Sequence, residues 1–190
     1  MKVFFIDSKG HQAKAILEQL ESKGCELLVY SNHADTKAAL SALNKFRPKL
    51  VIAGPGPKTD NDNAKAIINE SSRSIPIFGI GKGMHDIIEA FEGHAGKLHE
   101  PAIAKSSQIS HDSIGIFKGV KNNFLAGRYH ALQAIDVPYS FEISARSEDD
   151  IIMGIRHKEL PIAGILFDPV SILTEEGNKI LDNALKELKK

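Results

Sequence analysis

Short apolar runs alternate with segments of helical periodicity over residues 1–80, and this alternation constrains the fold more than any other feature of the chain. The apolar runs are typical of buried strands, whereas the segments between them repeat apolar residues at three- and four-residue spacing. Strands that alternate with helices of about ten residues indicate βαβ units and a parallel sheet. We predict strands over residues 3–6, 26–30, 50–53 and 75–80, and helices over about 12–22, 36–44 and 61–69.

The second half of the chain has a different character. Between residues 96 and 156 we predict short strands that are separated by turns, including strands around Ile109, over 114–117 and over 141–144. Two further strands are predicted over 151–156 and 162–167, followed by an amphipathic helix over 175–189. No repeat or linker divides the sequence. We therefore predict one α/β domain over residues 1–190, with a central parallel sheet, flanking helices and extra antiparallel strands in the second half.

The composition excludes several classes of function. Lys+Arg and Asp+Glu balance at 24 each, so no net charge attracts nucleic acid or an anionic membrane. Cys25 is the single cysteine, which excludes an internal disulfide and is typical of a reducing compartment. The apolar runs are too short for a signal peptide or a membrane span. The sequence predicts a cytoplasmic protein that binds neither nucleic acid nor membranes.

Residues 76–85 combine an apolar strand, a Gly-x-x-x-Gly frame and the start of a helix. Enzymes use such a strand-to-helix turn, a nucleophile elbow, to expose a Cys or Ser from a strained backbone. The central position here is Gly81, which has no side chain that could attack a substrate. Ligand sites of parallel sheets lie at the carboxyl ends of the strands, so this turn should face the loop at residues 54–58.

A series of short motifs runs in order along essentially the whole chain. These motifs are Gly54-Pro55-Gly56, the frame Gly79-x-x-x-Gly83, Lys105 with His111-Asp112, Arg128-Tyr129-His130, Met153 with Arg156-His157, and Phe167-Asp168-Pro169-Val170-Ser171-Ile172-Leu173-Thr174 with Gly177 after it. The set resembles the class I glutamine amidotransferases, most closely the small subunit of anthranilate and aminodeoxychorismate synthases. The resemblance implies a flavodoxin-like fold with a mostly parallel central sheet.

In that family a cysteine thiolate attacks the carboxamide of glutamine, and a histidine that is oriented by a glutamate acts as the base. Backbone N–H groups stabilise the oxyanion, and the released ammonia passes to the synthase. The resemblance places Gly81 at the nucleophile, Asp168 at the base and Val170 at the orienting carboxylate. An aspartate, with an ordinary pKa of about 3.9, cannot replace imidazole as a base near pH 7. The resemblance therefore implies that the triad has been lost.

The positions that would surround glutamine have changed as well. The resemblance assigns Gly56 and Lys82 to a vestigial oxyanion loop. It assigns a vestigial substrate pocket to His85, Ala131 and Leu166, where the family has Gln, Ser and Gln.

Two further features bear on this pocket. The segment Gly10-His11-Gln12 stands where the family has Asp-Ser-Phe after the first strand. Asp168 would bring a negative charge into the cleft, where it would oppose a bound anion more strongly than a helix N-terminus could attract one. We therefore expect Asp168 itself to fill the anion role, by pairing with Lys82 or with the N-terminus of the helix that follows Gly81.

Neither a metal nor a cofactor is predicted. The eight histidines lack His-x-x-x-His spacing and have no cysteine partner that would suggest structural zinc. The run from Gly79 to Gly83 lacks the Gly-x-x-x-x-Gly-Lys-Ser/Thr spacing of a nucleotide-binding loop.

The leading hypothesis is a catalytically inactive amidotransferase-like subunit. The resemblance implies a protein partner, either the large subunit of a chorismate-using synthase in tryptophan or folate biosynthesis or another ammonia-dependent enzyme. Two alternatives stay open, namely a small-molecule or anion sensor that uses the emptied pocket, and an enzyme with rewired chemistry.

Overall fold

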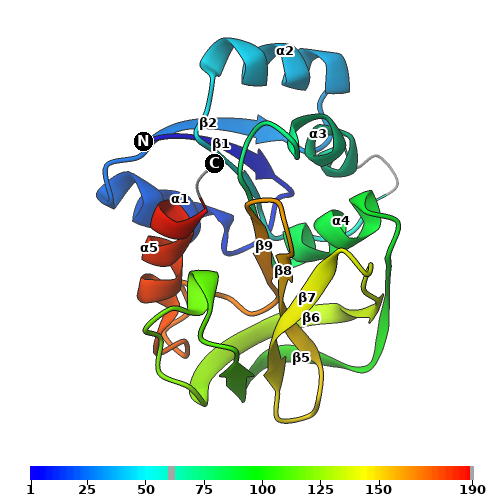
Figure 1. Ribbon diagram of the computed structural model, residues 1–190, viewed down its shortest axis with the longest axis vertical. Helices are drawn as coiled ribbons and strands as arrows, with labels where there is room; N and C mark the ends of the chain where they lie inside the picture. Colours follow the sequence, from blue (N-terminus) through cyan, green and yellow to red (C-terminus); the bar gives the residue numbers. More distant parts are fainter. Residues whose placement is uncertain (60–62, 189–190) are drawn as a thin grey trace.

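The amino-terminal half of the chain builds most of the parallel part of a central sheet. The structure is a computed structural model that describes residues 1–59 and 63–188 (Figure 1). The parallel strands, in spatial order, are β2 (Glu26–Ser31), β1 (Lys2–Asp7), β3 (Leu50–Ala53), β4 (Ile77–Ile80) and β9 (Ile162–Ile165). Every residue of the central strands β3, β4 and β9 is buried, as expected for parallel strands with helices on both faces.

Helices cover both faces of this parallel part (Figure 1). On one face, α1 (Ala13–Ser22) and α5 (Gly177–Glu187) lie side by side, joined by a 2.6 Å hydrogen bond from Gln19 Nε2 to Asn178 Oδ1. The helices of the other face are α2 (Thr36–Phe46), α3 (Ala64–Ser71) and α4 (Lys82–Ala90). Among the described residues, no helix is both long and apolar enough to cross a membrane.

Antiparallel strands extend the sheet beyond β9. Within the described ranges the sheet has nine strands in the order β2-β1-β3-β4-β9-β8-β7-β5-β6. The predicted α/β fold, a parallel sheet with flanking helices and an antiparallel extension, is confirmed. The antiparallel strands are β8 (Ile152–His157), β7 (Phe141–Ser147), β5 (His94–His111) and β6 (Phe124–Asp136).

Two predictions for the second half are wrong. The strand predicted over 141–144 corresponds to β7, but the short strands expected before it, from residue 96 onward, are two long ones, β5 and β6, which pair with each other along their length. Shifts in the register of this pair hide the alternation in the sequence. Residues 114–117 are not a strand, because Gly115–Phe117 forms the 3₁₀-helix η1. Gly115 has a positive φ, and Asp112 Oδ1 accepts a 2.9 Å hydrogen bond from the Ile114 N–H, so the chain turns there.

The ends of the other elements differ from prediction by a few residues, as is usual at helix and strand ends. The strand predicted over 75–80 begins at Ile77, and the one predicted over 162–167 ends at Ile165. Parts of two predicted helices, residues 61–62 and residue 189, lie outside the described residues.

Candidate functional site

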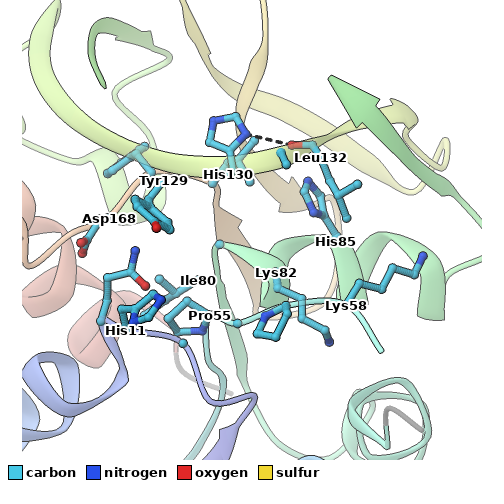
Figure 2. A pocket seen from close by; sticks show the side chains of 18 of the residues that line it. His11, Pro55, Lys58, Ile80, Lys82, His85, Tyr129, His130, Leu132 and Asp168 are labelled. Atoms are coloured by element: carbon cyan, nitrogen blue, oxygen red, sulfur yellow. Dashed lines mark hydrogen bonds between the residues drawn. The ribbon is translucent and has the colours of Figure 1, made fainter. Parts of the chain in front are cut away.

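A cavity of about 530 Å³ lies at the carboxyl ends of the parallel strands, where the sheet changes from parallel to antiparallel pairing (Figure 2). The loops after β1, β3, β4 and β9 form one side of it, and β5 and β6 form the other. The lining residues are Lys9, Gly10, His11, Gln12, Pro55, Gly56, Pro57, Lys58, Ile80, Gly81, Lys82, His85, Ile103, Tyr129, His130, Ala131, Leu132, Leu166, Phe167 and Asp168.

The turn between β4 and α4 has the strained geometry of a nucleophile elbow. Gly81 has φ 60° and ψ −117°, and its N–H donates a 2.8 Å hydrogen bond to the Ile165 carbonyl. L-residues rarely adopt this conformation, whereas glycine reaches it freely. Gly83 brings α4 against β3, because a Cβ at this position would lie 1.9 Å from the Ala53 carbonyl oxygen. The backbone of the elbow is therefore present, although the side chain that it would display is missing.

The loop after β3 faces this elbow, as the sequence predicts. A Cβ on Gly81 would lie 3.2 Å from the Pro55 Cβ. The Pro55 carbonyl accepts a 3.0 Å hydrogen bond from the Gly10 N–H, which ties the loop after β1 to the loop after β3. A Cβ on Gly56 would lie 2.0 Å from the Ser8 carbonyl oxygen, so only glycine fits between these loops.

Asp168 and Val170 lie in the loop after β9. The Asp168 carboxylate accepts a 3.0 Å hydrogen bond from the Val170 N–H and another from the Ser171 N–H. Burial raises the pKa of Asp168 above its ordinary value, although these hydrogen bonds oppose the shift. Val170 does not line the cavity and packs against the hydrophobic core instead.

The expected pairing of Asp168 with Lys82 or with the N-terminus of α4 is wrong. The Lys82 ammonium lies 2.7 Å from both carboxylate oxygens of Asp86, and both of these side chains are at most 6% exposed. Asp86 is one turn further along α4, the spacing at which opposite charges on a helix meet. The Asp168 carboxylate bonds to N–H groups of its own loop. Each charge thus has a local partner, and Lys82 points away from Asp168 (Figure 2).

Two histidines line the cavity next to each other (Figure 2). The pKa of His85 is lowered to about 3, mainly by burial and in smaller part by the neighbouring His130. No hydrogen-bond partner for the buried His85 Nε2 occurs among residues 1–59 and 63–188. His85 is therefore a neutral imidazole with an unsatisfied nitrogen.

His130, by contrast, is satisfied at both ring nitrogens. Its Nδ1 donates a 2.9 Å hydrogen bond to the Leu132 carbonyl, and its Nε2 accepts a 3.2 Å hydrogen bond from Arg128 Nε. Burial lowers the pKa of His130 to about 4, and the Arg128 charge adds to this. Arg128 is itself buried and held at 2.9 Å from both carboxylate oxygens of Asp149. This network fixes the cavity wall, and burial is the main reason that His130 stays neutral.

The structure gathers all but one of the site positions that the sequence singles out. Gly56, Gly81, Lys82, His85, Ala131, Leu166 and Asp168 all line the cavity, and Val170 does not. Sequence reasoning missed Leu132 and Ile103 at this site. Ile103 lies opposite Tyr129 in the register of β5 and β6, so only the correct pairing of these strands could have placed it there. Among the described side chains, no cluster of His, Cys, Asp and Glu could hold a metal ion.

Comparisons with known proteins agree with this geometry. The family model described as "Glutamine amidotransferase class-I" matches residues 4–188. Anthranilate synthase component 2 of Methanocaldococcus jannaschii is 45% identical over 157 residues, which cover 82% of this chain and 80% of the relative. Anthranilate synthase component 2 of Thermococcus kodakarensis is 40% identical over 151 residues, which cover 74% of this chain and 77% of the relative.

One solved structure matches nearly the whole fold. It is a Thermoplasma acidophilum protein described as "a putative gmp synthase subunit a protein", with a TM-score of 0.87 over 99% of this chain and 94% of that one. At 22% identity this likeness concerns the fold alone.

Proposed function

Because this chain belongs to the class-I glutamine amidotransferase family, we propose that it is a catalytically inactive subunit of the anthranilate synthase component II type. In this proposal residues 1–190 form a single amidotransferase-like domain that cannot hydrolyse glutamine. The domain binds the large subunit of a chorismate-using synthase, or another ammonia-dependent enzyme, that works on free ammonia.

The observation that carries the loss of activity is Gly81 at the centre of the elbow. Its backbone has the geometry that would present a nucleophile, and it has no atom that could form a thioester with glutamine. At the base position, the Asp168 carboxylate is occupied by N–H groups of its own loop. Val170 carries no charge that could orient a base. The substitutions thus remove the nucleophile, the base and its orienting group together.

An exposed apolar face beside the cavity supports a protein partner. Leu125, Gly127 and Tyr129 are spaced two residues apart along β6, so they lie on the same side of the sheet. On that side, Ile103 of β5 lies opposite Tyr129. Leu173 joins them, because a Cβ on Gly127 would lie 3.4 Å from the Leu173 Cβ. These four apolar side chains are 41–49% exposed. Contiguous exposed apolar patches mark protein interaction sites.

We name Ile103, Leu125, Tyr129 and Leu173 the β5–β6 apolar face. Ile103 and Tyr129 also line the cavity, so a partner that docks on this face would cover the cavity mouth. The matched relatives are named as component 2 of anthranilate synthase, which makes a synthase large subunit the first partner to test.

The test combines binding with turnover. The purified chain is mixed with the anthranilate synthase large subunit of the same organism, and the complex is measured by analytical ultracentrifugation. We expect a complex that makes anthranilate from chorismate and ammonium, and makes none from chorismate and glutamine. Glutamate release above that of a heat-denatured control would overturn the inactive assignment.

A matched pair of tyrosine variants tests the docking face. Tyr129→Lys places a charge within the β5–β6 apolar face and should abolish the complex. Tyr139→Lys changes a tyrosine that is 91% exposed and is not part of that face, so it should leave the complex intact. Equal binding by both variants would place the partner elsewhere.

A further inference from the structure

We infer that Ile172 anchors the interface with the protein partner, which offers it an apolar pocket and carries basic residues beside that pocket. The inference rests on the proposed function, in which the large subunit of a synthase docks on the β5–β6 apolar face. It adds the chemistry by which such a partner is recognised. It also commits to that partner as the occupant of the face, and not to a second copy of this chain.

The first observation is the exposure of Ile172, which lies in the loop after β9. Its side chain is 100% exposed, and no other large aliphatic side chain within residues 1–59 and 63–188 is as exposed. Leu173 follows it directly and belongs to the β5–β6 apolar face, so Ile172 extends an apolar surface that already marks an interaction site. The free energy gained on burial grows with the apolar area removed from water. Ile172 therefore gains most when a partner covers this surface.

The second observation is that hydrogen bonds on both sides of Ile172 hold its backbone in place. The Ser171 carbonyl accepts a 2.9 Å hydrogen bond from the Thr174 N–H, and Ser171 Oγ accepts a 3.2 Å hydrogen bond from the Leu173 N–H. Thr174 Oγ1 also accepts a 2.9 Å hydrogen bond from the Gly127 N–H, which ties the loop to β6. A residue that is displayed from a fixed backbone loses less conformational freedom when it is bound. The loop thus presents Ile172 already positioned for docking.

The third observation is that two exposed glutamates flank Leu125 at one end of the β5–β6 apolar face. Leu125 lies opposite Gln108 of β5, and the Gln108 carbonyl accepts a 3.1 Å hydrogen bond from the Glu148 N–H. On the other side of β6, Glu175 Oε2 accepts a 3.2 Å hydrogen bond from the Leu125 N–H. Both glutamates are exposed. The apolar surface therefore has an acidic margin here.

The alternation of the strands places Glu148 on the exposed side of the sheet. Ile109 and Ser147 lie opposite each other in the pairing of β5 with β7, and both are buried. Their neighbours Gln108 and Glu148 therefore point to the other face, where both are exposed. Because Gln108 lies opposite Leu125, this is the face that the partner would cover.

The acidic margin lacks counter-ions. The strand cations closest to it in the sequence already have acidic partners, and these pairs are Arg128 with Asp149, Arg146 with Asp150 and Lys105 with Glu100. Within residues 1–59 and 63–188, neither Glu148 nor Glu175 pairs with a cation. A partner with Lys or Arg beside its apolar pocket would supply the missing charges. A second copy that docked by the same face would bring further carboxylates there.

Binding kinetics test the anchor and the charges separately. The full chain is captured on a biosensor, and the anthranilate synthase large subunit of the same organism is the probe, at 50 and 300 mM NaCl. A buried anchor acts mainly on the dissociation rate, whereas a charge at the margin acts mainly on the association rate and its salt dependence. We expect the association rate of the wild type to fall about fivefold or more between the two salt concentrations.

Ile172→Ser tests the anchor. It should raise the dissociation rate about tenfold or more and leave the association rate nearly unchanged. The fully exposed side chain contributes no buried contact to the fold, so the variant should fold like the wild type. Val29→Ser is the control, because Val29 is an exposed aliphatic residue of β2, at the opposite edge of the sheet from β6.

Glu148→Lys tests the acidic margin. It should lower the association rate about threefold or more at 50 mM NaCl and should weaken the dependence on salt. Glu70→Lys makes the same change of charge on an exposed position of α3 and should leave both nearly unchanged. Glu175 is kept in both variants because its carboxylate also bonds to the Leu125 N–H.

Equal dissociation rates for Ile172→Ser and Val29→Ser would overturn the anchor. An association rate that neither salt nor Glu148→Lys alters would overturn the basic partner. In both cases a stable complex would leave the proposed function intact, whereas the absence of any complex would overturn both proposals. Analytical ultracentrifugation of the chain alone supplies the last check. A dimer that Ile172→Ser abolishes would overturn the inference, because a second copy would then occupy the face.

Discussion

The β4–α4 elbow and the loop after β9 would together hold a catalytic triad, yet different forces fix their shapes. Close backbone packing fixes the elbow, since Gly83 lies against the Ala53 carbonyl and a Cβ on Gly79 would lie 2.5 Å from the Gly83 carbonyl oxygen. Hydrogen bonds fix the loop after β9, where Thr174 Oγ1 donates to the Asp168 carbonyl at 2.5 Å and the Asp168 N–H donates to the Gly127 carbonyl at 2.9 Å.

The difference shows which parts of a catalytic site depend on catalysis. The elbow is part of how α4 packs on the sheet, so its backbone keeps its shape without a nucleophile. In the loop after β9, the hydrogen bonds of the Asp168 main chain and of Thr174 do not involve the side chains of Asp168 and Val170.

The largest effect should come from Gly83→Ala. The added methyl group would lie 1.9 Å from the Ala53 carbonyl oxygen and would force α4 away from β3. We expect such overpacking to lower the free energy of unfolding by about 3 kcal/mol or more. Gly24→Ala is the matched control, because Gly24 has a φ of +76° and open space around it. This control should cost only about 1 kcal/mol. Urea denaturation measures both, and equal losses would mean that packing does not fix the elbow.

Acid should destabilise the elbow side of the cavity through His85. Its pKa is about 3 in the folded chain and 6.5 without perturbation, so between these values the unfolded chain binds more protons. The contribution of neutral His85 to the free energy of unfolding is therefore fully present above pH 6.5 and is lost as the pH falls. For His85 alone, this loss amounts to about 2 kcal/mol between pH 7 and pH 5. Asp168 acts with the opposite sign, because its raised pKa makes the folded chain bind more protons.

Urea denaturation at pH 7 and pH 5 checks this prediction. His85→Leu should reduce the loss between the two pH values by about 2 kcal/mol, leaving the part that His130 carries. An unchanged loss in this variant would show that His85 is protonated at pH 5 without cost.

The loss in free energy of unfolding caused by Gly81→Ala should lie between the losses caused by Gly24→Ala and by Gly83→Ala. The added methyl group would sit at a positive φ and 3.2 Å from the Pro55 Cβ. We expect this combination to cost about 1–2 kcal/mol. Thermal melts of Gly81→Ala beside Gly24→Ala separate the cost of the contact from that of the backbone angle. A variant that melts at or above the wild type would show that the elbow relaxes once it carries a side chain.

Asp168→Asn should change stability only slightly. The amide oxygen can still accept a hydrogen bond from the Val170 N–H. The neutral side chain also avoids the cost of burying a charge, which is the cause of the raised pKa of Asp168. With the hydrogen bond kept, we expect a change of less than about 0.5 kcal/mol in the free energy of unfolding, whereas Asp168→Ala, which removes the acceptor, should cost about 1 kcal/mol. Urea denaturation of the two variants gives both values. A large loss in the asparagine variant would mean that the loop after β9 depends on the aspartate charge.

The smallest effect is expected for the activity of Gly81→Cys, which should release no glutamate. The cysteine would share the cavity with Asp168 and would have no base, and His85 and Ala131 line the substrate pocket in place of the family's residues. The comparison is with a variant that also carries Asp168→His, Val170→Glu, His85→Gln and Ala131→Ser. Robust turnover by the single variant would show that the loop after β9 still supports catalysis.

The sequence predicts the parallel half of the fold well because its central strands β3, β4 and β9 are buried throughout and read as continuous apolar runs. It fails for β5 and β6, whose residues alternate irregularly between core and solvent around the shifts in register. At the site, the order of the motifs places Gly81, Asp168 and His85 at one cavity. The sequence analysis did not predict the pairing of Lys82 with Asp86, although the two residues have i, i+4 spacing. It considered only Asp168, across the cavity, as a partner for Lys82.

The contact between Gly83 and the Ala53 carbonyl also limits how this chain can diverge in evolution. Any larger residue at that position would strain the contact between α4 and β3, whatever reaction the protein carries out. Positions 168 and 170 are under no such steric demand and can drift. The glycine spacing therefore reflects how the fold packs and does not depend on catalysis. It identifies members of the family equally well whether they are active or inactive.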